Sequence, residues 1–206
     1  MKTSTYFHIA LVLVSESASE SHFGADSHVG FAGAFRRAEL AAIRTENIEV
    51  RDRGLRVTLP RSKGERAGKT LTVALPYGAT SLCPVRALRR WQDAAGIKEG
   101  AVFRRIWTPP SRRKAKGPLP FPTVGFEAID SGSVARIVKR RAAAAGYDQD
   151  VFSGHNLTRG AMTTGMDHGV HPTKLKRLGR HKSYNVLDEY LEAGDPFEGH
   201  PLSGVL

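Results

Sequence analysis

The sequence predicts an α+β domain that is mainly helical and contains a small three-stranded antiparallel sheet. The strands are indicated by short runs of alternating apolar residues at 48–50, 55–59 and 71–75. The helices are indicated by apolar residues at helical spacing, with proline or a capping residue at some starts and glycine at the ends. The last third of the chain carries only helical signals, so helices dominate the fold.

Composition and charge limit the class of protein. With 40% hydrophobic and 25% charged residues, the chain is typical of one well-packed soluble domain. Its apolar runs are all shorter than the roughly 20 residues that a membrane-spanning helix requires, which excludes an integral membrane protein. The net charge of +11 is unusual, because such an imbalance makes a compact chain repel itself. A nucleic acid partner explains it best, while a merely soluble basic protein or a binder of anionic membranes stays open.

The N-terminal segment differs from the rest of the chain. Residues 1–28 are rich in serine and histidine without a sustained helical period, so we expect a leader or domain remnant that lacks stable order. Residues 1–30 carry one lysine and three carboxylates, which places the basic excess in the body of the chain. We therefore expect the folded domain at 29–206. Cys83 is the only cysteine, so an internal disulfide is excluded and a reducing cytoplasm is the expected compartment.

The first half of the domain combines one helix with the sheet. Apolar residues between Phe35 and Ile43 predict a helix, and the three strands follow it. In the second strand Leu55, Val57 and Leu59 alternate with polar residues, which is typical of a strand with one buried face. The polar, glycine-containing segment 61–69 then forms a hairpin to the third strand.

Helices make up most of the remaining chain. Pro84 and Gly96 bracket a helix with one apolar side, and Ser133 and Gly146 bracket a longer one, with Ser133 as the N-cap. Three short helices follow, and their ends are predicted at Gly169, Gly179 and Gly194.

Basic side chains gather in two places that could contact DNA phosphates. Segment 104–116 is predicted to be a loop, and its charge run is either a solvated surface or a phosphate-contacting one. The predicted helix at 133–146 adds a basic face. The candidate DNA-contacting residues are Arg104, Arg105, Arg112, Arg113, Lys114, Lys116, Arg136, Lys139, Arg140 and Lys182.

The residue types in the chain favour metal-free cleavage of DNA. That reaction needs a nucleophile, cations that neutralise a pentavalent phosphate, and an acid that protonates the departing 5′ oxygen. Tyrosine, arginine, histidine and lysine perform these tasks. The sequence has neither a carboxylate cluster nor a Cys/His pattern with metal-ligand spacing, so we expect no metal and no other cofactor.

Five segments, in the same order, resemble the catalytic domain of tyrosine recombinases, the phage integrase family. They are Gly33-Ala34-Phe35-Arg36-Arg37-Ala38-Glu39-Leu40, Arg61-Ser62-Lys63, Ser153-Gly154-His155-Asn156-Leu157, Gly179-Arg180-His181-Lys182-Ser183 and Val186-Leu187-Asp188-Glu189-Tyr190. Tyr190 lies nine residues after His181, which matches the spacing that the family uses. The resemblance spans roughly residues 29–206.

This resemblance implies a role for each matched residue. Arg36 is the arginine that clamps the phosphate and Glu39 a supporting carboxylate. Lys63 reaches into the minor groove and protonates the leaving hydroxyl. His155 and His181 are the active-site histidines, and His181 hydrogen-bonds the phosphate. Tyr190 is the nucleophile that forms a 3′-phosphotyrosine link, and the implied partner is double-stranded DNA.

One active-site arginine is missing. The family's His-x-x-Arg pattern places the second arginine three residues after His155, where this chain has Thr158. Arg159 follows, but one residue is about 100° of rotation on a helix, so Arg159 should point elsewhere. A neutral hydroxyl in place of a bidentate cation costs about 3 kcal/mol of transition-state stabilisation, so we expect weak or lost cleavage.

The organisation of the chain also departs from the family pattern. Relatives carry an N-terminal core-binding domain that closes a clamp around DNA, and residues 1–28 do not resemble it. We therefore expect low sequence selectivity and steep salt dependence. The tail 194–206 resembles integrase C-termini that dock on a neighbouring protomer, which implies a homo-oligomer on DNA. The resemblance also implies a cytoplasmic protein associated with a prokaryotic nucleoid.

Two other functions stay open. The chain could be a catalytically dead, DNA-binding remnant of an integrase, which Thr158 favours. It could also be a type IB topoisomerase, which uses similar chemistry but whose motifs are spaced less like those of this sequence.

Overall fold

The computed structural model describes residues 24–59, 71–107, 123–153, 155–181 and 183–184. Several residues singled out from the sequence lie outside this part of the chain. They are Lys63, Arg112, Arg113, Lys114, Lys116, Lys182 and Tyr190, together with the leader at 1–23 and the tail at 194–206. In the described part the fold is mainly helical, with a three-stranded antiparallel sheet, so the predicted fold class is confirmed.

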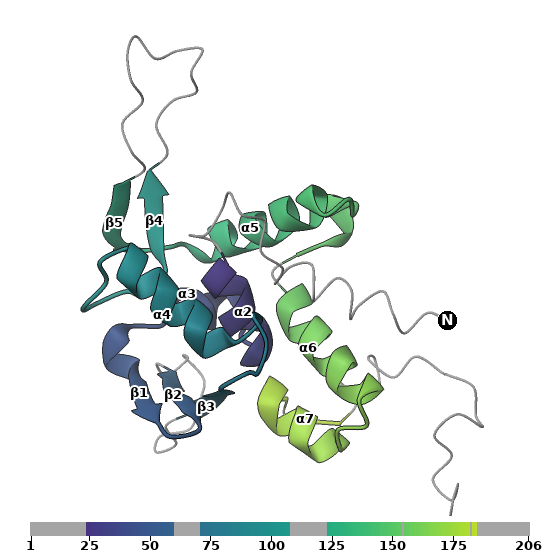
Figure 1. The fold of residues 1–206 in the computed structure, drawn as a ribbon. Helices are drawn as coiled ribbons and strands as arrows, with labels where there is room; N and C mark the ends of the chain where they lie inside the picture. Colours follow the sequence, from purple (N-terminus) through teal and green to yellow (C-terminus); the bar gives the residue numbers. More distant parts are fainter. Residues whose placement is uncertain (1–23, 60–70, 108–122, 154, 182, 185–206) are drawn as a thin grey trace, which may run out of the picture.

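Helix α2 (Gly24–Ala32) lies at the centre of the fold and contacts α4, α6 and α3 (Figure 1). Val29 is buried in this helix, and so are the four residues before it, from Ala25 to His28. The domain start that the sequence placed near Val29 therefore falls inside a packed helix. The polar residues Asp26, Ser27 and His28 concealed that helix, because they interrupt its apolar period.

The three-stranded sheet forms as the alternating pattern predicted. Strands β1 (Ile48–Arg51), β2 (Gly54–Leu59) and β3 (Leu71–Pro76) pair antiparallel in the order β1-β2-β3. Leu55, Val57 and Leu59 are buried, while Arg56 between them is exposed. Gly54 adopts a φ of 145°, and a Cβ there would lie 2.0 Å from the carbonyl oxygen of Leu75, so only glycine fits.

Helix α4 (Pro84–Ala94) packs against this sheet and against α2. It begins at its proline and buries Val85, Leu88 and Trp91, as predicted. The indole Nε1 of Trp91 donates a hydrogen bond of 2.8 Å to the carbonyl oxygen of Val102. This bond satisfies the polar end of a large buried aromatic side chain.

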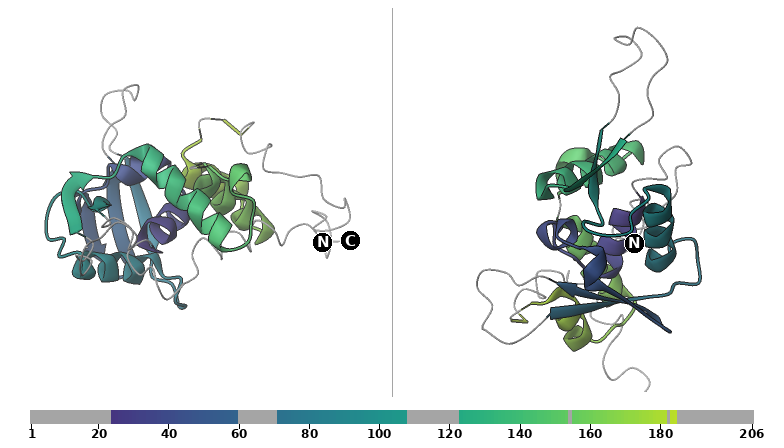
Figure 2. Two further views of the ribbon diagram at one scale, coloured as in Figure 1. Left: turned by 90° about the horizontal axis from the view of Figure 1, so that it is seen from above. Right: turned by 90° about the vertical axis from the view of Figure 1, so that its left-hand side faces the viewer.

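A second sheet was not predicted. Strands β4 (Arg104–Trp107) and β5 (Thr123–Ala128) pair antiparallel and stand away from the first sheet (Figure 2). The prediction that a loop begins at Arg104 is therefore wrong for residues 104–107, which form β4. Two adjacent arginines before Ile106 and two prolines after Trp107 hid the strand, because they leave no alternating apolar run.

Helix α3 (Arg37–Ala41) is one short turn, whereas a longer helix was predicted there. The C-terminal helices come after the second sheet. Helix α5 (Ser131–Ala144) is capped by Asp130, whose carboxylate accepts a 2.8 Å hydrogen bond from the backbone N–H of Ser133, so Ser133 is not the N-cap. Single-turn 3-10 segments occupy Thr45–Asn47 and Gln149–Val151.

Helices α6 (Asn156–Asp167) and α7 (Pro172–Gly179) contact each other. They end close to Gly169 and at Gly179, where the sequence predicted their ends. Gly169 follows α6 with a φ of 67°. After α7, however, it is Arg180 that takes the left-handed conformation, with φ 56° and ψ 38°. The helix predicted to end at Gly194 lies outside the described residues.

Asp26 is a buried carboxyl group in an apolar setting. It lines a mainly apolar pocket together with Trp91, Ile106 and Val134, and its own exposed fraction is 7%. Burial raises the pKa of Asp26, while the charge of Arg141 and hydrogen bonds from Ser27 act against that increase. The ionised carboxylate is therefore less favourable in the folded chain than in the unfolded chain.

Replacement of Asp26 by Asn should stabilise the fold in a pH-dependent manner. Because the folded-state pKa is raised, the aspartate destabilises the fold increasingly as the pH rises from its ordinary pKa of 3.8 through the folded value. Asp26→Asn should match the wild type at low pH and exceed its free energy of unfolding at pH 7 by on the order of 1 kcal/mol. Urea unfolding across pH measures this difference. The exposed Asp93→Asn is the control, and an equal gain there would contradict the explanation.

Candidate functional site

The turn between α2 and α3 presents the first candidate residues. Ala34 and Phe35 are fully buried, and Ala34 has a positive φ of 46°. Arg36 is the N-cap of α3, and its backbone N–H donates to Oε2 of Glu39 at 2.8 Å. The Arg36 guanidinium also pairs with Glu39, with 2.9 Å between Nη1 and Oε1. Glu39 therefore fixes both the backbone and the side chain of Arg36.

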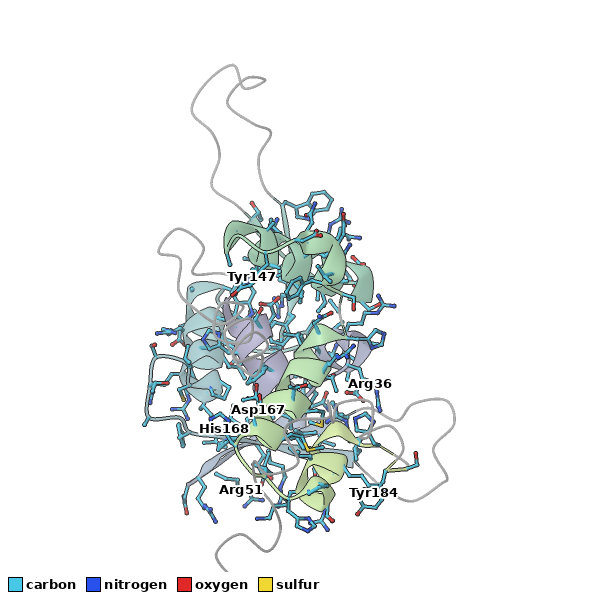
Figure 3. All side chains as sticks on the ribbon, turned by 90° about the vertical axis from the view of Figure 1, so that its right-hand side faces the viewer. Arg36, Arg51, Tyr147, Asp167, His168 and Tyr184 are labelled. Atoms are coloured by element: carbon cyan, nitrogen blue, oxygen red, sulfur yellow. The ribbon has the colours of Figure 1, made fainter. Side chains whose placement is uncertain are left out.

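Arg36 also reaches the end of α7, far along the chain. Its Nη2 lies 3.5 Å from the carbonyl oxygen of Gly179 and 3.4 Å from that of Arg180. The side chain is 46% exposed, so this cation is held by the protein and still open to solvent. In Figure 3, Arg36 and Tyr184 lie toward the same side of the ribbon, near α7. The structure thus brings the first and fourth matched segments together.

Arg180 lies beneath Arg36 and is almost completely buried, with 5% of its side chain exposed. Its guanidinium donates to four different residues. Nη1 donates to the carbonyl oxygens of Gly33 at 3.0 Å and Leu178 at 2.7 Å. Nη2 donates to the carbonyl oxygen of Ala34 at 2.6 Å and to Oε2 of Glu39 at 2.5 Å, and Nε lies 3.4 Å from Oε1 of Glu39.

His181 follows in the same turn, and its ring folds back over the end of α7. A Cβ on Gly179 would lie 2.5 Å from Cδ2 of His181 and 2.9 Å from Sδ of Met162, so the glycine makes room for the ring. Burial lowers the pKa of His181, and the positive charges of Arg36 and Arg180 lower it further. Both effects favour the neutral imidazole over the imidazolium, and its Nε2 is buried in the folded chain.

Thr158 stands where the family pattern has an arginine. Its side chain is buried, with 7% of the residue exposed, and its hydroxyl lies 3.2 Å from the carbonyl oxygens of both Ala34 and Phe35. Arg159, the next residue on the helix, is exposed. Thr158 and Arg180 bind the same carbonyl oxygen, that of Ala34.

The remaining candidates lie on other elements. His155 is exposed at the start of α6, about one helical turn before Thr158. Arg136 and Lys139 lie along α5 and pair with Asp130 at 3.4 Å and Asp150 at 3.3 Å, and Arg140 is exposed on the same helix.

The β4–β5 sheet carries two of the basic candidates on exposed aromatic rings. Arg104 lies over Phe126 and Arg105 over Trp107, at 5.8 and 4.1 Å from the ring centroids. Phe126 is 86% exposed and Trp107 57%. These basic residues are separate from the cluster around Arg36.

The described part of the chain contains no group of three or more His, Cys, Asp or Glu side chains arranged to hold a metal ion. Likewise, none of its helices combines the length and the apolar character needed to cross a bilayer.

Comparison with known proteins relates both the sequence and the fold to recombinases. The chain is 35% identical over 177 residues to an integrase/recombinase xerD homolog from Selenomonas ruminantium; the match covers 85% of this chain and 48% of that protein. The chain therefore spans about half the length of the curated relative that it matches. No protein-family model matches it.

Two solved structures share the fold at low sequence identity. The XerA recombinase superposes with a TM-score of 0.67 at 15% identity, over 97% of this chain and 62% of the other. The XerH site-specific recombinase, in a pre-cleavage complex with its difH substrate, gives 0.64 at 13% identity, over 96% and 52%.

The fold is thus the catalytic-domain fold of DNA recombinases. The chain belongs to the tyrosine recombinase family and carries a catalytic domain of that family. This confirms the resemblance drawn from the five segments.

No role was predicted for Arg180, although it lies with Arg36 and Glu39 in one cluster. It stands inside a matched segment, but arginine is ordinarily exposed, and nothing local indicates that this one is buried. The only signal is indirect: the helix-ending glycine precedes an arginine, so a bulky residue must adopt the left-handed conformation.

Replacement of Gly179 by Ala should displace the His181 ring while the helix persists, because alanine favours helix but its Cβ would occupy the place of the ring. The ring then gains contact with water, and the pKa of His181 should rise toward its ordinary value. NMR titration of the imidazole protons measures this pKa. Gly160→Ala is a matched control in α6, where the new Cβ meets only Phe31 at 3.4 Å. An unchanged pKa in folded Gly179→Ala would contradict the packing argument.

Proposed function

We propose that this chain binds double-stranded DNA and cleaves and rejoins it, as part of a site-specific recombinase or integrase, through a 3′-phosphotyrosine intermediate. The observation that carries the proposal is the convergence of Arg36 and the segment of His181 from positions more than 140 residues apart. A half-exposed cation beside a neutral imidazole suits one phosphate group of a DNA backbone.

The proposed roles follow the metal-free chemistry. Arg36 binds two phosphate oxygens through its guanidinium, and His181 donates a hydrogen bond to the same phosphate. The hydroxyl of Tyr190 attacks the phosphorus atom, while Lys63 protonates the departing 5′ oxygen. His155, at the start of α6, is the second active-site histidine in this proposal. Attack by the freed 5′ hydroxyl on the phosphotyrosine then restores the phosphodiester and releases Tyr190.

DNA is held mainly through its phosphates in this proposal. The net charge of +11 and the basic residues of β4 and α5 supply contacts that carry no sequence information. We also propose that protomers assemble on DNA through the tail 194–206.

Thr158 favours a second candidate, a DNA-binding remnant that no longer cleaves. Its hydroxyl already binds backbone carbonyl oxygens, so it replaces neither the charge nor the reach of an arginine. The loss of about 3 kcal/mol of transition-state stabilisation corresponds to cleavage at least roughly a hundredfold slower.

A covalent protein–DNA complex distinguishes the two candidates. On a nicked suicide substrate, a cleaving enzyme should accumulate a covalent band that Tyr190→Phe abolishes, because the phenol oxygen forms the link. Tyr184→Phe is the matched control, since it removes an exposed phenol six residues earlier and should leave the band in place. DNA binding without a covalent band would establish the remnant instead.

Replacement of Thr158 by Arg should raise the yield of the covalent complex by at least about tenfold, because it adds a charged bidentate donor for the phosphate. Thr158→Gln has similar bulk without charge and is the control. A covalent yield that rises equally in both variants, or in neither, would contradict the proposed role of position 158.

A further inference from the structure

We infer that Arg180 is a positioning residue: it neutralises Glu39 from within the protein, so that Arg36 keeps a net positive charge for phosphate. The inference builds on the proposed function for its effect on DNA, but the electrostatics can be measured on the protein alone. Of the two guanidiniums that pair with Glu39 among the described residues, that of Arg180 is the buried one.

The geometry excludes a direct role of Arg180 in binding phosphate. A guanidinium has five N–H donors, and the structure gives the Arg180 guanidinium five acceptor contacts. Its side chain is 5% exposed, whereas that of Arg36 is 46% exposed. Arg180 is therefore a completed internal contact, and Arg36 is the cation that faces outward.

The charges explain why Arg36 needs this partner. Glu39 binds both guanidiniums through its two oxygens, so the three side chains carry one net positive charge. Without Arg180, the carboxylate would have Arg36 as its only counter-ion in the cluster, and the pair would be neutral. A neutral pair attracts a phosphate weakly, and its carboxylate repels the phosphate at short range.

Arg180 also joins the two halves of the site mechanically. It binds the carbonyl oxygens of Gly33 and Ala34 on one side and that of Leu178 on the other. These contacts hold Arg180 in a left-handed conformation that is unfavourable for a residue with a side chain. His181 is the next residue, so the left-handed backbone of Arg180 sets the direction in which the imidazole leaves the turn.

The test on DNA measures how binding depends on salt. In Arg180→Met, the slope of log affinity against log salt concentration should fall in magnitude by about 0.9, the value of one phosphate contact, as it should in Arg36→Met. Arg180→Met/Glu39→Gln should regain the wild-type slope, because removal of the carboxylate frees Arg36 again. A purely structural role for Arg180 predicts no such rescue.

Matched variants separate this effect from loss of charge and loss of fold. Arg177→Met removes an exposed arginine from the same helix and should leave His181 unchanged. Arg180→Gly relieves the left-handed backbone and should show the same changes as Arg180→Met in a chain that folds. Arg180→Lys retains the charge and should retain the wild-type slope.

A measurement on the free protein keeps the inference independent of DNA binding. NMR titration of His181 should show a higher pKa in Arg180→Met and Arg180→Gly, because one cation is lost and Arg36 becomes neutralised. In Arg180→Met/Glu39→Gln the pKa should fall back. A wild-type chain that does not bind or cleave DNA would refute the proposed function, and this titration would still decide the role of Arg180.

The inference is overturned by any of three results. The first is an unchanged His181 pKa in folded Arg180→Met or Arg180→Gly. The second is a failure of Glu39→Gln to reverse the effects of Arg180→Met. The third is the loss of one phosphate contact in folded Arg180→Lys.

Discussion

The candidate site depends on one carboxylate that two arginines share. Glu39 sits 18% exposed between a buried guanidinium and a half-exposed one, and it also caps the helix on which it stands. A carboxylate in such a place needs compensation, because its loss of hydration is costly. Arg180 supplies that compensation from below. Glu39 then orients Arg36 without neutralising its charge, because Arg180 balances the carboxylate. The same contacts connect the turn that carries His181 to the turn that carries Arg36.

Much of the fold follows from local patterns in the sequence. Period-two alternation in β2 buries Leu55, Val57 and Leu59, and Pro84 starts α4, because both signals depend only on neighbours along the chain. The failures occur where local rules conflict with tertiary contacts. The strand at Arg104 is stabilised by its pairing with Thr123–Ala128 rather than by its own residues, and α2 buries Asp26 and His28 because helices on several sides enclose it.

The site was predictable in part. Arg36, Glu39 and His181 could be named because each lies in a short segment that resembles the family, and the structure brings Arg36 to the segment of His181. Helical rotation alone predicted that Arg159 points away from the direction of Thr158, and in the structure Arg159 is exposed while Thr158 is buried. Arg180 could not be assigned, since its role depends on carbonyl groups of Gly33 and Ala34, which only the folded chain presents. The roles of Arg36, Glu39, Lys63, His155, His181 and Tyr190 all stay predictions.

The link between residues 33–39 and 178–181 has a consequence for synthesis of the protein. The contacts of Arg180 span sequence separations of up to 147 residues, so they close one of the longest loops in the chain. Closing such a loop carries an entropic cost that must be met before the contacts form. While Arg180 is still inside the ribosome, the pair of Arg36 and Glu39 that has already emerged carries no net charge. The net positive charge that we propose for phosphate binding therefore appears only after residue 180 has emerged.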